Sequence, residues 1–151
     1  MGKKVGRMIA LSTPRRLIGD LLHYSHQIPT VPVQRRMNLA DMGETRALAP
    51  QRVSWCAIFT KAWTKTALIA GTFGVTVYAG LGAESLHLLA PTTTTMNYGM
   101  AQADGNVLVR IVYDHRVLDG LTIARTLAFM EEVLHQDVVQ ELRDGVPGRA
   151  A

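Results

Sequence analysis

Asp114-His115-Arg116-Val117-Leu118-Asp119-Gly120 is the stretch that decides the fold of this chain. It follows an apolar run at 107–113 and precedes a helical pattern that begins after Gly120. A turn between a rigid strand and a helix can hold an imidazole in one orientation, and imidazoles accept protons near neutral pH. His115 is therefore a candidate general base, and a hydrogen-bonded structural histidine is the alternative interpretation. Asp119 is a candidate helix cap, and Gly120 permits a close backbone path.

The residues before this stretch predict a hairpin and a central strand. Asp104-Gly105-Asn106 is a strong hairpin signal. Both faces of the run at 107–113 are apolar, which is typical of a strand inside a sheet, and Arg110 is its one charge. The Thr-rich run at 92–100 and the apolar run at 73–78 also favour strands.

The N-terminal residues predict a helix followed by a strand. Thr13 is expected to be the N-cap of the helix and Pro14 its first residue, because a proline there leaves no hydrogen bond unmade. Pro29 cannot continue that helix. The next run, 30–39, is interpreted as a strand, and Pro32 places it at an edge or at a strand start.

Two further helices are predicted from their caps and apolar spacing. Ser54 begins one of them, and Gly71 ends it. The other follows the opening stretch and runs to about Gln136, after which Asp137 is expected to cap a final short helix. The element order predicts an α+β fold, with helices packed on a mainly antiparallel or mixed sheet. The length of 151 residues suits one domain spanning 1–151.

Composition excludes several classes of protein. With 48% hydrophobic and 19% charged residues, wholesale disorder is excluded. The single cysteine, Cys56, allows no internal disulfide or cysteine metal cluster, and we expect no metal site and a reduced, cytoplasmic setting. The net charge is +4, but the sequence shows no platform of aromatic and basic residues of the kind that nucleic-acid-binding proteins use. The uncharged run Thr66–Ala83 contains four glycines, and Phe73–Tyr78 within it suits a buried strand better than a membrane span.

Several blocks of the chain, in the same order, resemble the dihydrolipoamide acyltransferase catalytic domain of 2-oxo acid dehydrogenase complexes. More distantly they resemble chloramphenicol acetyltransferase. The blocks are an opening helix with the Ile-Pro start of the following strand at 15–31, a Lys-Ala helix at 59–62, a Gly-Thr-Phe strand at 71–76, and the 114–120 signature. The resemblance covers most of the chain and implies a shortened fold of the chloramphenicol acetyltransferase type.

This resemblance implies an acyl transfer between coenzyme A and a dihydrolipoamide-like thiol. His115 would be the general base, and Thr76 would stabilise the tetrahedral oxyanion through its hydroxyl. Asp119 would hold the turn through a salt bridge to Arg15 or Arg16, and both remain candidates. The family's site lies between subunits of a trimer, so a homotrimer or larger assembly is implied. No lipoyl or peripheral-subunit-binding domain is expected within the chain, so lipoamide would be supplied by another, lipoyl-bearing protein.

The chain departs from the family pattern in its middle. Only Trp63–Ala70 separate the Lys-Ala helix from the Gly-Thr-Phe strand, where the family carries a long section with part of the substrate channel. Two functional hypotheses follow from this. The first is a working acyltransferase, and the second is a non-catalytic trimeric scaffold or assembly protein derived from the same family.

Overall fold

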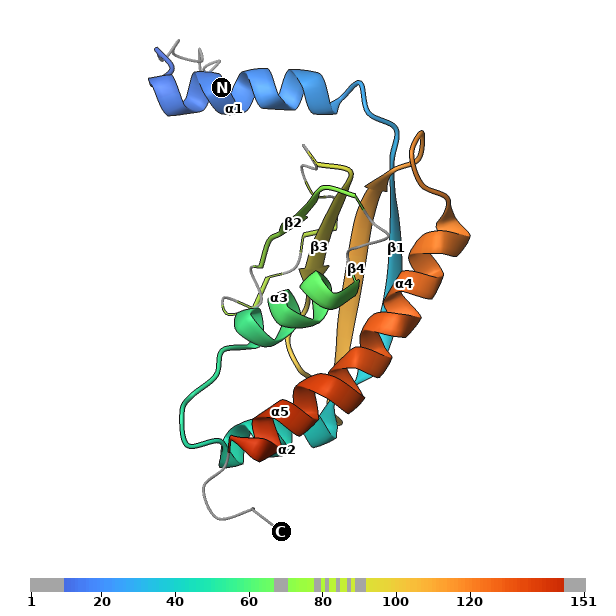
Figure 1. Ribbon diagram of the computed structural model, residues 1–151. Coiled ribbons are helices and arrows are strands. Elements are labelled where there is room, and N and C mark those ends of the chain that lie inside the picture. Colours follow the sequence, from blue (N-terminus) through green and yellow to red (C-terminus); the bar gives the residue numbers. More distant parts are fainter. Residues whose placement is uncertain are drawn as a thin grey trace, which may run out of the picture.

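A four-stranded sheet covered on one face by helices forms the body of the protein (Figure 1). The computed structural model describes residues 10–66, 71–77, 80, 82–83, 85–86, 88 and 92–145. The elements in chain order are α1 (Thr13–Ser25), β1 (Thr30–Asn38), α2 (Ala40–Leu48), α3 (Trp55–Thr66), β2 (Phe73–Val75), β3 (Thr94–Tyr98), β4 (Asn106–Asp114), α4 (Gly120–Val133) and α5 (Val139–Asp144). The predicted α+β class is confirmed.

The strand order is β1-β4-β3-β2. β4 pairs antiparallel with both β1 and β3, whereas β2 pairs parallel with β3, so the sheet is mixed. The prediction that β4 lies inside the sheet is confirmed, and so is the edge position of β1. Pro32 is tolerated there because one side of an edge strand needs no ladder donor. The strand predicted at 73–78 begins at Phe73, but Tyr78 lies outside the described residues.

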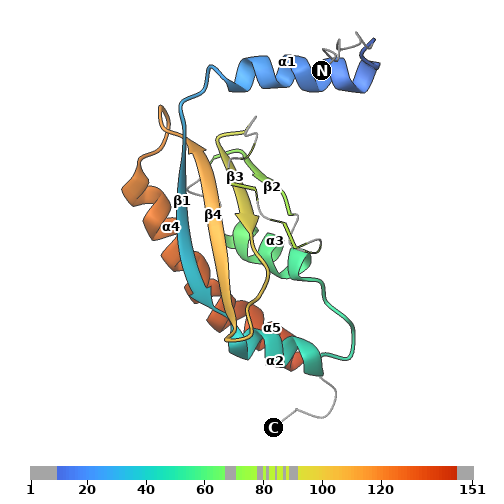
Figure 2. The ribbon, with the colours of Figure 1, turned by 180° about the vertical axis from the view of Figure 1, so that it is seen from behind.

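The hydrophobic core lies between the sheet and the helices α3 and α4, and Figure 2 shows the sheet from its other side. Phe59 and Trp63 of α3 are fully buried, and the ring of Phe59 stacks on that of Tyr98 at 4.1 Å. From α4, Ile123 and Met130 are also fully buried. Aromatic and aliphatic packing of this kind fixes how the strands lie relative to the helices.

The β3–β4 hairpin closes against the start of α2. Gly105 has a φ of +78°, which a glycine adopts without strain. A Cβ at this position would lie 2.6 Å from the Cβ of Ala40, so the close approach also requires glycine. The backbone N–H of Leu39 donates to the carbonyl of Gly105 at 2.9 Å, which ties the hairpin to the end of β1. The predicted hairpin is therefore confirmed, with its glycine at the tightest point.

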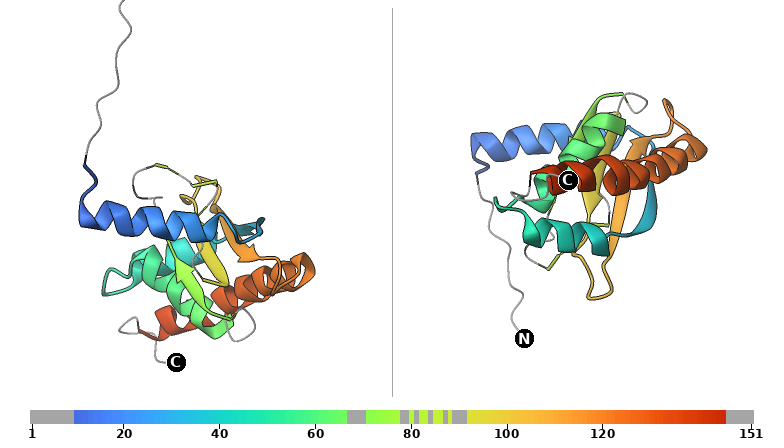
Figure 3. Two further views of the ribbon diagram at one scale, coloured as in Figure 1. Left: turned by 90° about the horizontal axis from the view of Figure 1, so that it is seen from above. Right: turned by 60° about the horizontal axis from the view of Figure 1, so that its bottom comes forward.

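The helix after Gly120 corrects one expectation. Asp137 was expected to cap a separate helix, but α4 passes into a π-helical turn, Leu134–Val138, and that turn continues directly into α5. Figure 3 shows α4 and α5 as one long rod. The residue that precedes α5 is Val138, which has no cap hydrogen bond, and Asp137 lies inside the π turn. The expectation failed because a wide turn absorbs an extra residue without ending the helix.

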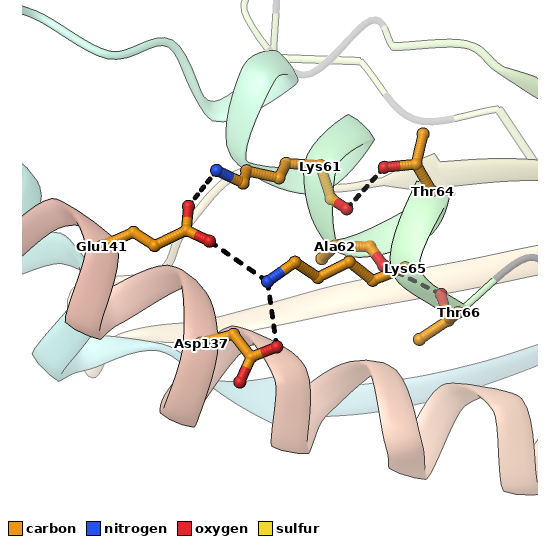
Figure 4. Close-up of polar contacts among 7 residues, drawn as sticks. All are labelled: Lys61, Ala62, Thr64, Lys65, Thr66, Asp137 and Glu141. Carbon is orange, nitrogen blue, oxygen red and sulfur yellow. Dashed lines mark hydrogen bonds and ion pairs between the residues drawn. The ribbon is translucent and has the colours of Figure 1, made fainter.

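An ion-pair cluster joins α3 to this rod (Figure 4). Lys61 and Lys65, one helical turn apart on α3, both bind the carboxylate of Glu141. The ammonium of Lys65 also lies 2.9 Å from Asp137 Oδ2. Hydrogen bonds from both lysines hold the pKa of Glu141 below its ordinary value. The lysine of the Lys-Ala block therefore has a structural partner within the chain.

Helix α1 makes few contacts with the rest of the chain. Figures 1 and 2 place it beyond the end of the sheet, and none of its residues is buried. It begins one residue earlier than expected, with Ser12 as N-cap and Pro14 as its second residue. Its large apolar residues are all exposed; they are Leu17, Ile18, Leu21, Leu22 and Tyr24. A helix of 13 residues is marginal in water without packing, so this apolar stripe is a surface suited to a partner.

Candidate functional site

The turn that carries His115 is clamped by the residues on either side of it. Asp114 ends β4 and is 7% exposed, and its carboxylate accepts from Arg116 Nη2 at 2.7 Å and from the Arg116 backbone N–H at 2.9 Å. The carbonyl of Asp114 accepts from the N–H groups of Val117 and Leu118, each at 3.1 Å. The hydrogen-bonded Arg116 side chain holds the pKa of Asp114 below its ordinary value. The turn is therefore fixed by its own charged residues.

His115 is presented to the surface by this turn. Its side chain is exposed, and its backbone N–H donates to the carbonyl of Pro29 at 3.0 Å. The ring lies 5.6 Å from that of Tyr113 at a tilt of 41°. No described residue hydrogen-bonds the imidazole, so its two nitrogens are open to solvent or to a substrate. This geometry suits a proton acceptor.

Asp119 caps α4. Its Oδ1 accepts from the backbone N–H of Thr122 at 2.7 Å, as the cap interpretation predicted. This backbone hydrogen bond lowers the pKa of the Asp119 carboxyl. Arg15 and Arg16 are exposed on α1, and no described arginine forms an ion pair with Asp119. The salt bridge between α1 and Asp119 therefore stays a prediction.

Thr76 follows β2 at the opposite edge of the sheet from β1. Its backbone N–H donates to the carbonyl of Met96 at 3.0 Å, which continues the parallel pairing by one residue. A Cβ at Gly74 would lie 3.6 Å from Thr95 Oγ1, so Gly74 and Thr95 face the same side of the sheet. Thr76, two residues on, faces that side as well. This is the side away from the main core, because Val75 packs against the core.

Within one chain, Thr76 and His115 do not meet. The register aligns Val75 with Met96 and Met96 with Ile111, so Thr76 is level with Arg110. His115 lies five residues further along β4 and two strands across. At about 3.4 Å per residue and 4.8 Å per strand, this separation is roughly 20 Å. If the two side chains act on one substrate, they must come from different copies of the chain.

A polar row crosses the sheet beside Thr76, and the sequence indicated only the charge of Arg110 within it. Asn97 is paired with Arg110 across β3 and β4, and Arg110 with Gln34 across β4 and β1. Asn97 is 2% exposed and Arg110 is 6% exposed. The guanidinium of Arg110 donates to Gln34 Oε1 at 2.9 Å and to the carbonyl of Ser85. The sequence signal was the lone charge in an apolar strand, which predicts a buried polar contact but not its partners.

Among the described residues, no three metal-ligating side chains lie close together, and no helix is long and apolar enough to cross a membrane.

An apolar pocket of about 510 Å³ lies beside the start of α3, lined by Trp55, Phe59 and Tyr98 among others. Burial raises the pKa of Tyr98 to about 12. Tyr98 ends β3, whereas the His115 turn lies at the other end of that strand, so the pocket is separate from the turn.

Comparison with known proteins identifies the fold. No family model and no curated protein matches the sequence. Among solved structures, a probable dihydrolipoamide acetyltransferase from Listeria monocytogenes 4b F2365 has a TM-score of 0.73 at 13% identity, covering 97% of this chain and 98% of that one. The cubic core of the pyruvate dehydrogenase multienzyme complex has a TM-score of 0.71 at 10% identity, covering 93% and 95%.

A third solved structure agrees with these two. The dihydrolipoamide acetyltransferase of Azotobacter vinelandii has a TM-score of 0.70 at 10% identity, covering 91% of this chain and 94% of that one. The chain therefore has the α+β fold of the acyltransferase cores of 2-oxo acid dehydrogenase complexes. The predicted fold is confirmed, and at such low identity the likeness defines the fold alone.

Proposed function

We propose that the protein is an acyltransferase of the 2-oxo acid dehydrogenase core type, with coenzyme A and a dihydrolipoamide-like thiol as its substrates. The observation that carries this proposal is the clamped turn that presents an exposed His115 directly after the central strand. In the Azotobacter vinelandii acetyltransferase, a serine, a histidine and an asparagine have been studied for their roles in the catalytic mechanism. The last two are four positions apart, as His115 and Asp119 are here.

In the proposed step, the proton and the broken and formed bonds are exchanged only among the two substrates and the imidazole of His115. The thiol sulfur attacks the thioester carbonyl carbon, and its proton passes to His115. The carbonyl oxygen becomes an oxyanion that accepts a hydrogen bond from the Thr76 hydroxyl. The carbon–sulfur bond of the thioester then breaks, and the departing thiolate takes the proton back from His115. Asp119 keeps the helix after the turn in place through its cap.

This mechanism needs more than one copy of the chain. Because Thr76 and His115 are roughly 20 Å apart in one copy, we propose a homotrimer or larger assembly in which neighbouring copies contribute one residue each. The exposed apolar stripe of α1 supports such association. The lipoamide would reach the site on a separate lipoyl-bearing protein. The exposed thiol of Cys56 is compatible with a reduced, cytoplasmic setting.

A measurement of acyl transfer tests the proposal. The wild type, His115→Ala and the control His135→Ala are compared for acetyl transfer from acetyl-CoA to dihydrolipoamide. Loss of a general base lowers the rate by about 10²–10⁴-fold, so only His115→Ala is expected to fall by this amount. His135 is a suitable control because it lies on the π turn, beyond the far end of α4, where it pairs with Asp41. Equal background rates for all three proteins would reject the catalytic proposal.

A second candidate is a non-catalytic trimeric scaffold derived from the same family. The observation that favours it is the short connection between α3, which ends at Thr66, and β2, which begins at Phe73. In this case native mass measurements would show an oligomer while all three proteins of the kinetic experiment stay at background. A monomer at micromolar concentration would argue against both candidates, because the site and the scaffold each depend on neighbouring copies.

A further inference from the structure

The amide of Asn97 is a buried donor without a partner. Its Nδ2 is inaccessible to solvent and has no hydrogen-bond acceptor among the described residues. A buried donor that stays unbonded is destabilising because it gives up its hydrogen bond to water, and native proteins rarely keep one without a reason. The other such donor in the described part of the chain is Trp63 Nε1, but Trp63 lies in the core on the opposite face of the sheet.

The position of Asn97 relates it to Thr76. Val75 is aligned with Met96 in the parallel pair, so Thr76 is aligned with Asn97. Aligned residues on neighbouring strands face the same side and have their Cβ atoms about 5 Å apart. A single oxygen atom can therefore lie about 3 Å from both the Thr76 hydroxyl and the Asn97 amide nitrogen. Thr76 is partly exposed, so such an oxygen can approach it from the outer side of the row. Because Asn97 Nδ2 is inaccessible in the resting protein, the amide must turn outward to meet the oxygen.

The charge next to Asn97 also favours a negative oxygen. Arg110 is aligned with Asn97 on β4 and is buried on the same face. Its guanidinium donates to Gln34 and to the carbonyl of Ser85, and no described carboxylate forms an ion pair with it. A buried cation raises the local potential, and this potential acts strongly on any charge that develops in a poorly solvated site.

From these observations we infer that Asn97 is a second catalytic donor, whose amide N–H binds the same oxyanion as the Thr76 hydroxyl. This inference rests on the proposed acyl transfer and extends it to a residue that the sequence resemblance does not assign. It explains why an unpaired amide is kept under the sheet surface. In the resting protein the donor is unbonded, and in the tetrahedral intermediate it gains an acceptor. An interaction made only in the transition state raises the catalytic rate without tightening substrate binding.

Substitution of Asn97 by leucine tests the inference because it separates catalysis from stability. Leucine is similar in size to asparagine and removes the unbonded polar group, so the Tm of Asn97→Leu is expected to equal or exceed that of the wild type. Its kcat is expected to fall about 100-fold, with KM nearly unchanged, as for the loss of one oxyanion donor. Thr95→Val is the matched control, because Thr95 is a buried polar residue on the same strand and face and lies two residues before Asn97.

The possible outcomes are distinguishable. A normal kcat for Asn97→Leu would overturn the donor assignment and leave the proposed acyl transfer intact. A lowered Tm, with activity lost in proportion to the unfolded fraction, would make the amide structural and would also overturn the assignment. If Asn97→Leu does not fold, Asn97→Asp provides the second variant, because a carboxylate repels an oxyanion and should lower kcat at least as far. Background activity in the wild type would remove the proposed function and this inference together.

Discussion

The carboxylate of Asp114 accepts a hydrogen bond from Nη2 of Arg116 at 2.7 Å and another from Nε of the same guanidinium at 3.0 Å, so the two residues that flank His115 are hydrogen-bonded to each other. Only one residue, His115, lies between them, and its side chain is thereby held on the outer side of the turn. The strand, the turn and the helix that follow one another in sequence thus form a rigid support for an exposed imidazole.

Removal of the Arg116 side chain should release the Asp114 carboxylate. In Arg116→Ala the pKa of Asp114 is expected to rise toward its ordinary value of 3.8, which NMR titration of the carboxyl carbon would detect. Because the folded pKa is lowered, the contribution of Asp114 to stability is present above that value and is lost as the pH falls through the folded pKa. The variant should therefore lose less stability in acid than the wild type. Arg125→Ala is the control, and an equal change in Asp114 there would contradict the assignment.

The cap at Asp119 should depend on its oxygen rather than on its charge. Asp119→Ala is expected to lower the free energy of unfolding measured in urea, whereas Asp119→Asn should stay near the wild type, since asparagine caps as well as aspartate. The pKa of Asp119 is lowered by the N–H of Thr122, so its stabilising effect is present above about pH 4 and fades in acid. Asp119→Asn should lack this acid dependence. Equal destabilisation by both substitutions would point to the charge instead.

Two glycines should respond in opposite directions to alanine. In Gly105→Ala the new Cβ would lie 2.6 Å from the Cβ of Ala40, and the alanine would need a φ of +78°. The substitution is therefore expected to destabilise the protein by more than about 1 kcal/mol. Gly19 lies inside α1, and no neighbouring atom comes within 4 Å of the place that a Cβ would take there, so Gly19→Ala should raise the helix content of α1. Urea unfolding measures the first variant, and circular dichroism measures the second. A tolerated Gly105→Ala would show that the hairpin can move away from α2.

The ion-pair cluster between α3 and α5 should give a weak, salt-dependent stabilisation. Glu141→Gln removes the carboxylate shared by Lys61 and Lys65, and the side chains of all three residues are between 36% and 49% exposed. Exposed pairs of this kind contribute at most about 1 kcal/mol, and salt screens them. The difference in Tm from the wild type should therefore shrink in about 1 M NaCl and below pH 4.5, the ordinary pKa of the glutamate. Asp144→Asn is a control on the same helix, and a salt-independent effect would contradict the electrostatic explanation.

The central features of the fold were predictable because local sequence determines them. The hairpin at Gly105 needs a positive φ, Ser54 caps α3 by accepting from Ala57 at 3.1 Å, and both faces of β4 are apolar in the sequence as they are buried in the structure. Each of these signals acts over a few residues. Helix propensity and turn chemistry are of the same short range, so they can be recognised in one chain.

The features that sequence reasoning missed depend on distant parts of the chain. Nothing local to Asn97 indicates that it is aligned with Thr76, because that pairing joins strands separated by the segment between β2 and β3. The burial of Arg110 likewise depends on Gln34 and Ser85. The π turn at 134–138 has no sequence signal of its own, since an acidic residue before a short helix is also the pattern of a cap. Thr76 and His115 each match the resemblance, but their separation becomes clear only from the register.

The π turn at Leu134–Val138 has a consequence for alignment with other proteins. An α-helix advances by about 100° for each residue, so one additional residue in a regular helix would rotate every later side chain by that amount, whereas a wide π turn takes up the residue and leaves the later side chains on their faces. In agreement with this, Asp137 lies in the turn and Glu141 beyond it, and both contact Lys65. A relative with a regular helix here would have one residue fewer, and its alignment with this chain would need a gap inside an unbroken rod rather than in a loop.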